Sequence, residues 1–464
     1  MTRQTRRGPA ATRPVQIFEV STLYGAATLA AAVDAGQFGP PGAARRILLV
    51  STNAVNPEAA TRLTRMNGFD SLARRFDETV DWNEAIRPHH PSTWTPARDE
   101  SPLWERMFRN AWRLGDAPVE LIVESVHVSP AKALATVFGG SAIHVYADGL
   151  MSYGPTRDRL PQWLGCRIRR LLHLDLVPGL RPLLLAEHTV PPETVPGDAF
   201  VKVLGELGAA AREEPELARV AADRPTAVLL GQYLAALDIL TPEEEEELHV
   251  RMLRGAVAAG HERLVFKPHP TAPARYSRIL EETAAQAGVW LHVLGGPVLA
   301  EAVYERCRPT LVVGCFSTAL LTAATYYGIP IARVGTTALL DRLAPYQNSN
   351  RIPVTIVDYA VPDLESEEET YSPMTPRKAE ELGALVRTVG YCMQSKLHPL
   401  LREEAAAWLG AHLDEHTGRY FKRRRLTALA LPGGGTSARA RLLRSSPTAR
   451  RAARQVRAVR RRLS

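Results

Sequence analysis

The sequence predicts an α/β protein with two doubly wound parallel sheets facing a cleft, followed by a basic tail. Apolar, β-branched runs alternate with helical patterns in both halves of the 464-residue chain, and such alternation builds parallel sheets. The pattern is clearest in the first strand–helix–strand segment of the chain. VQIFEV (15–20) and RILLVS (46–51) flank an alanine-rich helical stretch from Thr22 to Ala35, and two strands joined by a helix need a parallel crossover.

The same patterns predict each further element. Short apolar runs indicate strands at 119–123, 142–146, 226–230, 263–266, 290–294, 309–313, 330–334 and 353–357. Proline-rich, tryptophan-bearing segments such as 81–104 are expected to be long loops. Residues 197–224 are charged and helical. The run 241–255 predicts an amphipathic helix whose acid-rich first turn faces solvent.

These patterns divide the chain into five segments. They are a basic, disordered N-terminus (1–14), a first α/β domain (15–205), a second α/β domain (206–375), helices expected to cross the domain junction (376–415) and an Arg-rich tail (416–464). After the break at Leu431–Gly435 the tail is expected to be loosely ordered.

Charge is distributed unevenly along the chain. The net charge is +8, but residues from Thr417 onward carry fifteen Lys and Arg and no acid, which leaves about −7 for the remainder. Such a tail suits an anionic membrane surface. A disordered tail without a binding role is the alternative. Nucleic acid is an unlikely partner, because the body is acidic and no aromatic side chains are interleaved with the basic ones.

Four cysteines without a CxxC spacing predict reduced, buried thiols in the cytoplasm. No apolar segment follows the basic N-terminus, and the longest apolar stretch, Leu23 to Val33, is too short to cross a bilayer. We therefore expect a cytoplasmic protein, peripheral at the inner face of the plasma membrane.

Polar motifs follow three of the predicted strands. Asp148-Gly149 follows 142–146, Lys267-Pro268-His269-Pro270 follows 263–266, and Ser317-Thr318 follows 309–313. Open α/β sheets bind ligands at the carboxyl ends of their strands. The sequence therefore predicts that these motifs line the cleft.

Each motif alone is weak evidence. With 13 His and 35 Pro, chance gives about one His-Pro pair, and the chain has three, at 90–91, 269–270 and 398–399. Asp-Gly is a common turn, and Ser or Thr commonly begins a helix. Their order and their shared position at strand ends give the combination its weight.

This order, an acid before Gly, a His-Pro pair and a Ser/Thr pair, resembles the bacterial sialyltransferase and polysialyltransferase families. Segments 16–36, 146–160 and 171–187 are similar to the actinobacterial alpha-2,8-polysialyltransferase-like glycosyltransferases. The resemblance covers residues 15 to about 410. It implies a GT-B fold, in which two Rossmann-like domains, for acceptor and CMP donor, face each other.

The resemblance implies an inverting transferase that moves a sialic-acid-like nonulosonic acid from its CMP ester to a glycan hydroxyl. The acceptor would be a glycan or lipid-linked polysaccharide, as in capsule synthesis. The departing CMP phosphate is already an anion, so the reaction needs one base and several phosphate donors. No metal or cofactor is expected.

Asp148 is the expected catalytic base, and Gly149 would allow close approach of the acceptor. The family pattern often has two acids before the glycine, whereas this chain has Ala147 first. An Asp that only holds its own turn is the alternative. Glu124-Ser125, Tyr24 and Tyr153 are weaker expectations for the acceptor side.

On the donor side, His269 is the expected phosphate partner, with Lys267 and Pro270 beside it. Ser317 and Thr318 open a predicted helix at 318–327, whose N-terminus suits a phosphate. Gln232 and Glu301 are weaker candidates for CMP contacts, and an exposed helical acid is the alternative for Glu301. Three histidines and one cysteine are expected to be core residues: His127, His173, His292 and Cys315.

Other functions stay open at this point. They are a nucleic-acid-binding protein, a catalytically silent nucleotide- or glycan-binding relative, and a transferase that uses another nucleotide donor, such as a teichoic-acid-type polymerase.

Overall fold

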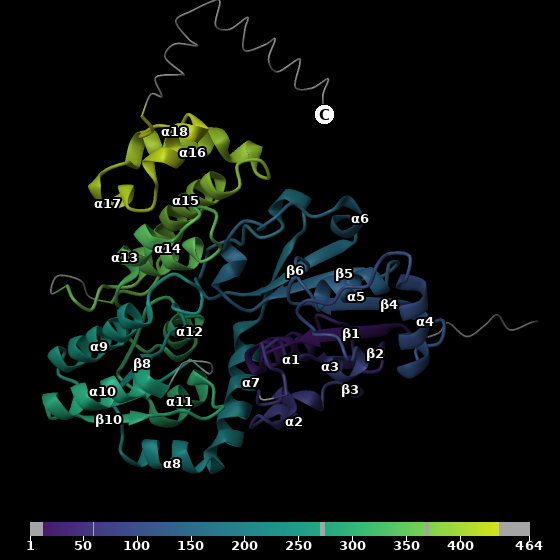
Figure 1. Cartoon of the computed structure of the whole chain (residues 1–464), viewed down its shortest axis with the longest axis horizontal. Helices are drawn as coiled ribbons and strands as arrows, with labels where there is room; N and C mark the ends of the chain where they lie inside the picture. Colours follow the sequence, from purple (N-terminus) through teal and green to yellow (C-terminus); the bar gives the residue numbers. More distant parts are fainter. Residues whose placement is uncertain (1–12, 59, 270–273, 367–370, 436–464) are drawn as a thin grey trace, which may run out of the picture.

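The computed structural model describes residues 13–58, 60–269, 274–366 and 371–435. It contains two separate parallel sheets, each covered by helices, which lie side by side in Figure 1. The predicted fold class, two doubly wound α/β domains, is confirmed.

The first sheet has seven parallel strands in the order β3-β2-β1-β4-β5-β6-β7. Its strands are β1 (Val15–Val20), β2 (Arg45–Val50), β3 (Glu78–Asp81), β4 (Val119–Val123), β5 (Ala142–Ala147), β6 (Ile168–Leu174) and β7 (Pro192–Val195). The order in which strands are added reverses between β1 and β4, because β2 and β3 lie on one side of β1 and β4 to β7 lie on the other. Ligands are expected at the carboxyl ends of β1 and β4.

The second sheet has five parallel strands in the order β10-β9-β8-β11-β12. Its strands are β8 (Ala227–Leu230), β9 (Arg263–Lys267), β10 (Trp290–Val293), β11 (Leu311–Gly314) and β12 (Ile331–Arg333). All five were predicted within two residues. The equivalent reversal lies between β8 and β11.

Helices cover both sheets and extend beyond the second one. Those of the first domain are α1 (Leu23–Asp34), α2 (Phe69–Ala73), α3 (Trp82–Ala85), α4 (Ser101–Ala111), α5 (Ala131–Val137) and α6 (Gln162–Gly165). Next come α7 (Gly197–Ala210), α8 (Pro215–Ala222), α9 (Pro242–Ala258), α10 (Ala274–Ala287), α11 (Ala300–Cys307) and α12 (Thr318–Tyr327). The last are α13 (Thr336–Arg342), α14 (Arg351–Ala360), α15 (Pro376–Met393), α16 (Arg402–His412), α17 (Glu415–Gly418) and α18 (Arg423–Leu429).

Helix α1 begins at a side-chain cap, because the Thr22 hydroxyl accepts a hydrogen bond from the Gly25 N–H. Small residues dominate the helix, and all of its residues from Gly25 to Val33 are buried. One side faces the first sheet, and α7 packs against another. An alanine-rich helix allows this close packing on both sides.

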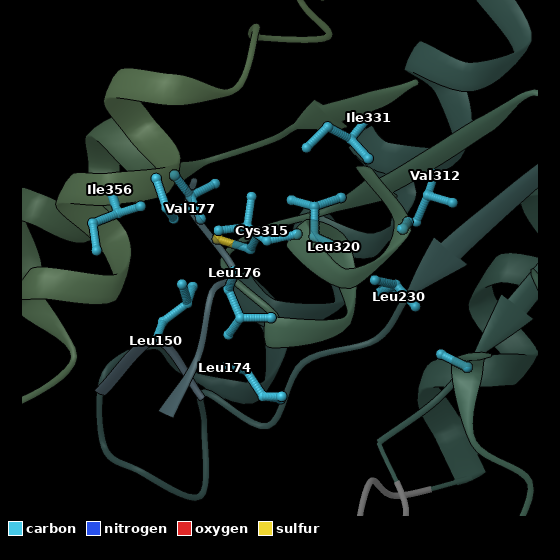
Figure 2. Close-up of a cluster of buried hydrophobic side chains, with 14 of the residues drawn as sticks. Leu150, Leu174, Leu176, Val177, Leu230, Val312, Cys315, Leu320, Ile331 and Ile356 are labelled. Carbon is cyan, nitrogen blue, oxygen red and sulfur yellow. The ribbon is translucent and has the colours of Figure 1, made fainter. Parts of the chain in front are cut away.

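Helix α7 connects the domains, since it contacts α1 and α2 of the first and α11 of the second. Residue 205, the boundary expected from the sequence, lies inside this helix. The apolar core is also continuous across the junction. In Figure 2, Leu176 and Val177, which follow the first sheet's β6, lie beside Cys315 of the second domain, and Leu320 belongs to the same cluster.

Two sequence predictions of local structure were wrong. Residues 353–357 lie within α14 rather than in a strand, because this helix is buried from Arg351 to Asp358 and an apolar run buried all round has no distinguishing period. Segment 81–104 is not a long loop throughout. It contains α3 and the start of α4, and its tryptophans, Trp82, Trp94 and Trp104, pack in one aromatic cluster.

Three further expectations need correction. Cys166 is exposed, although Cys315 and Cys392 are buried as expected. Glu245, in the acid-rich first turn of α9, is fully buried and accepts hydrogen bonds from the Leu234 and Ala235 N–H groups. Residues 416–435 are not a free tail, since α18 packs on the body and Arg425 donates to the Cys392 carbonyl. Residues 436–464 lie outside the described part.

The shared core predicts the effect of one substitution. Leu320 is fully buried at the domain junction, so Leu320→Ala should lower the free energy of unfolding by about 2–5 kcal/mol. Leu400 is 93% exposed, so Leu400→Ala should change the free energy of unfolding by less than about 0.5 kcal/mol. Urea denaturation measures both. Similar small losses in the two variants would contradict the packed junction.

Candidate functional site

Three carboxylates gather at the carboxyl edge of the first sheet. Glu19 lies near the end of β1, Glu124 directly follows β4, and Asp148 directly follows β5. These strands are neighbours in the sheet, so residues about 100 positions apart in the chain meet at its edge. The group lies at the reversal between β1 and β4, where such sheets bind ligands.

Hydrogen bonds fix Glu19 and Glu124 relative to each other. The Glu124 N–H donates to Glu19 Oε2 at 3.2 Å, and the Ser21 hydroxyl donates to Glu124 Oε2 at 3.0 Å. The Tyr146 hydroxyl donates to the Glu19 carbonyl at 3.1 Å. The strand ends therefore form one polar unit.

Asp148 lies over the first turn of α1. A Cβ atom added to Gly25 would be 3.3 Å from Asp148 Oδ2 and 3.2 Å from the Tyr146 hydroxyl. Only glycine leaves room for the carboxylate there. Free N–H groups and the dipole at a helix N-terminus favour a negative charge at this place.

Burial dominates the electrostatics of the site. It raises the pKa of Asp148 to about 7, and the neighbouring charge of Glu124 adds to the rise. Burial also raises the pKa of Glu124, and it raises that of Glu19 to about 8. Burial thus favours the protonated form of all three carboxyl groups, and the pKa of Asp148 allows it to take up and release a proton near neutral pH.

A cavity of about 290 Å³ opens beside Asp148. Its wall includes the polar residues Glu124, Ser125, His127, Asp148, Arg157 and Ser349. Apolar side chains, among them Met151, Leu184 and Met393, form the rest. Because Ser349 and Met393 follow the second sheet in the chain, the cavity lies between the two parts of the molecule.

The two domains touch directly at the Asp-Gly turn. A Cβ atom added to Gly149 would lie 3.1 Å from Thr318 Oγ1 of α12. One turn along, the Tyr24 hydroxyl of α1 and Thr322 Oγ1 lie 2.9 Å apart in a hydrogen bond. The first motif and the third motif therefore meet across the junction, as the sequence predicts for residues lining one cleft.

Glu301 belongs to this junction and is not an exposed helical acid. Its side chain is buried, and burial raises its pKa to about 7, while a hydrogen bond to Thr322 opposes the rise. Within the described part of the chain, its Oε1 atom is buried and has no hydrogen-bond partner. That oxygen can accept a hydrogen bond from a ligand.

The second motif lies at the carboxyl edge of the second sheet. The Lys267 ammonium is buried and donates to the Gly296 carbonyl at 3.2 Å, and burial lowers its pKa to about 8. His269 is exposed and stacks on Tyr233, with ring centroids 5.0 Å apart. Loss of hydration around the ring lowers the pKa of His269.

Gly231 ties the second motif to the reversal point of the second sheet. A Cβ atom added there would lie 2.9 Å from the Pro268 Cα and 3.1 Å from the His269 N. Gln232, the next residue, is buried, and its N–H donates to His249 Nε2 at 3.1 Å. The backbones of the β8 and β9 ends are thus packed together.

Ser317 is the N-cap of α12, and its hydroxyl accepts from the Ala319 N–H at 3.3 Å. Thr318 is the first residue of this helix and is partly exposed. The expected helix 318–327 is therefore confirmed to the residue. Capping by Ser317 and phosphate binding by the free N–H groups are compatible.

The structure sorts the remaining sequence expectations. Pro270 lies outside the described residues. Tyr153 does not line the cavity, because it is fully buried and its hydroxyl accepts from the Val177 N–H. His127 is not a satisfied core residue, since it lines the cavity and its buried Nε2 has no described partner. His173 is a core residue, with Nδ1 3.1 Å from the Leu174 carbonyl.

Sequence reasoning missed Glu19 and Arg157. Glu19 is the only acid in an otherwise apolar-rich strand, VQIFEV, and a charged side chain in a buried strand is the signal that marks it. Arg157 follows the Asp-Gly turn by nine residues, and its contact with Ser349 cannot be read from the sequence.

Comparison with known proteins gives one family match. A family model described as alpha-2,8-polysialyltransferase matches residues 16–336. A search of curated proteins gives no match. The two parallel-sheet domains have the GT-B arrangement.

Solved structures similar to this chain share little sequence with it. The UDP-GlcNAc 2-epimerase from Neisseria meningitidis bound to UDP-GlcNAc is 10% identical, with a TM-score of 0.45, covering 90% of this chain and 96% of that one. The GT-B domain of a sialyltransferase from Photobacterium damselae is 11% identical, with a TM-score of 0.41, covering 73% and 95%.

The high pKa of Asp148 predicts a pH-dependent stability. The folded protein binds this proton more tightly than the unfolded chain, whose carboxyl titrates near 3.8. Stability should therefore fall as pH rises from about 4 to about 8. Asp148→Asn removes this loss, so the variant should exceed the wild type by up to about 4 kcal/mol at pH 8.5 and differ little at pH 4. Equal stabilities in urea at both pH values would contradict the buried charge.

Proposed function

The chain belongs to the alpha-2,8-polysialyltransferase family, and on that premise we propose that it transfers a sialic-acid-like nonulosonic acid from its CMP ester to a glycan hydroxyl. The anomeric carbon of the donor would be attacked by the acceptor oxygen. The new carbon–oxygen bond forms as the bond to the CMP phosphate breaks, and CMP leaves with the electron pair. A single displacement of this kind inverts the anomeric centre.

Asp148 would act as the general base that takes the acceptor proton. Its pKa of about 7 suits proton transfer near neutral pH, because a base is most effective when its pKa lies close to the working pH. The cavity beside it offers space for the acceptor sugar. The apolar wall of this cavity can pack against the C–H face of a sugar ring.

The phosphate of CMP would be held from the second domain. His269 can donate a hydrogen bond from its exposed ring, and the N-terminus of α12 offers free N–H groups beside Thr318. The unpartnered Oε1 of Glu301 would accept from a ribose hydroxyl or the cytosine amino group. Gln232 and Lys267 would act indirectly, since the Gln232 N–H already donates to His249 and the Lys267 ammonium already donates to the Gly296 carbonyl.

The observation that carries the proposal is the contact between Gly149 and Thr318. It supports the proposal because the expected base and the expected phosphate-binding helix belong to the two sides of one junction. A displacement needs base and leaving group on opposite sides of the reacting carbon, and this junction supplies groups of both kinds. The departing phosphate is already an anion, so neither a metal nor a cofactor is part of the proposal.

The acceptor would be a glycan or a lipid-linked polysaccharide at the inner face of the plasma membrane. No helix in the described part of the chain is long and apolar enough to cross a membrane. Residues 436–464 contain ten arginines and no acid, and each arginine near an anionic bilayer contributes about 1 kcal/mol. This segment would hold the enzyme close to a membrane-bound acceptor.

A donor screen tests the proposed reaction. CMP-sialic acid should yield CMP when a glycan acceptor is added, whereas UDP- and CDP-linked sugars should yield little free nucleotide. Asp148→Asn should lose about 10²–10⁴-fold in kcat while keeping its affinity for CMP. Asp158→Asn, an exposed acid ten residues away, is the matched control. Full activity of Asp148→Asn would exclude this base, and a preference for UDP-sugars would exclude this donor.

His269→Ala tests the phosphate site. Loss of a hydrogen bond to a charged group should lower kcat/KM for the donor by about 10- to 100-fold. His261 precedes the same strand at its other end, where its Nδ1 lies 3.1 Å from Thr226 Oγ1, so His261→Ala should leave donor kinetics unchanged. If the two variants behave alike, His269 does not bind the donor.

The tail segment has its own test. Deletion of residues 436–464 should weaken binding to phosphatidylserine-containing vesicles and reduce its salt dependence. Turnover of a short soluble acceptor should change little. A full-length variant with the ten arginines replaced by glutamine keeps the length and should bind as weakly as the deletion. Unchanged vesicle binding in both would rule out the membrane role.

A further inference from the structure

We propose that Glu124 is a positioning residue for the base: its carboxylate, one strand away from Asp148, keeps Asp148 a strong enough base to take the acceptor proton. The inference rests on the proposed function, in which Asp148 is that base. It assigns a role to a side chain outside the three sequence motifs.

The strand order brings the two carboxylates to one wall. Strands β4 and β5 are parallel neighbours with Val123 paired to Val145, so Glu124 and Asp148 both lie just beyond the same edge. Both side chains line the cavity of about 290 Å³. A group entering this cavity therefore meets both acids.

Glu124 is held in place on two sides. Its carboxylate accepts from the Ser21 hydroxyl at 3.0 Å, and its N–H donates to Glu19 Oε2 at 3.2 Å. Glu19 is itself only 1% exposed. Burial raises the pKa of Glu124, and the hydrogen bond from Ser21 opposes this rise by favouring the charged form. The half-buried position of the carboxylate limits the screening of its charge by water.

The charge of Glu124 acts on Asp148 across the cavity wall that the two side chains share. Two carboxylates that share a site resist being ionised together, so an ionised Glu124 strengthens the hold of Asp148 on a proton. The raised pKa of Asp148, for which Glu124 is a cause after burial, agrees with this effect. The stronger base accepts the acceptor proton more readily at neutral pH.

Other titratable groups around Asp148 differ from Glu124 in charge or position. Burial raises the pKa of Glu19, Tyr24 and Tyr146, which favours the protonated form of each. Glu301 acts on Tyr24 from the other domain. Arg157 and His127 lie on the cavity wall. Glu124 is the acid that acts directly on Asp148.

Glu124→Gln tests the proposal with two readouts. The acidic limb of kcat/KM against pH should move to lower pH by about one unit, because the neighbouring charge is gone. Carbon-13 NMR of labelled aspartate, with the Asp148 signal identified from Asp148→Asn, should show the same shift in the Asp148 titration. A purely structural role would lower activity without moving either midpoint.

Two variants serve as controls. Glu120→Gln makes the same change on the same strand at its opposite end and should leave the midpoint unchanged. Glu124→Asp keeps the charge and should preserve the wild-type midpoint. This variant tests the proposal even if Glu124→Gln fails to fold.

The readouts separate the inference from the proposed function. An unshifted Asp148 titration in Glu124→Gln overturns the inference, whatever the activity. If Glu124→Gln does not fold, a midpoint in Glu124→Asp displaced to that of a neutral neighbour, about one unit lower, overturns it. A shifted titration in a protein that releases no CMP from any donor supports the coupling of the two acids and overturns only the transferase proposal.

Discussion

The contact between the carboxyl edge of the first sheet and the N-terminus of α12 controls the chemistry of this molecule. Where Gly149 faces Thr318 and Tyr24 hydrogen-bonds Thr322, the ends of β4 and β5 are partly buried. Burial raises the pKa of Asp148, and the charge of Glu124 adds to the rise. The same contact lies between the turn that carries Asp148, the proposed base, and the N-terminus of α12, the proposed phosphate-binding element.

Buried carboxylates are costly, so another part of the structure must hold them in place. The apolar core that runs from Leu174 and Val177 to Leu320 does this, because it fixes the two domains against each other. Helix α7 adds contacts to both domains. The stability of the apolar core thus offsets the cost of burying these carboxylates at the edge of the first sheet. Such a relation between a stable fold and a costly functional site is common in proteins.

The local pattern of the sequence was sufficient to predict where most strands lie. It also predicted that the first and third motifs lie at strand ends, because each motif directly follows an apolar run. It was insufficient for side chains whose surroundings depend on sheet order. Glu19 and Glu124 become neighbours only because β1 and β4 pair, and Glu301 is buried only because α11 faces α7 and α12. The prediction of a strand at 353–357 was wrong for a related reason, since the burial of α14 on every side conceals the helical period.

The central claim is that the two domains bind one substrate from opposite sides, and a crystal structure with CMP tests it most directly. The account predicts that the CMP phosphate contacts His269 and the N-terminus of α12. Asp148 should then face the side of the phosphate where the sugar would be attached. A CMP molecule bound within the first domain, or one whose phosphate lies away from both His269 and Thr318, would contradict the account.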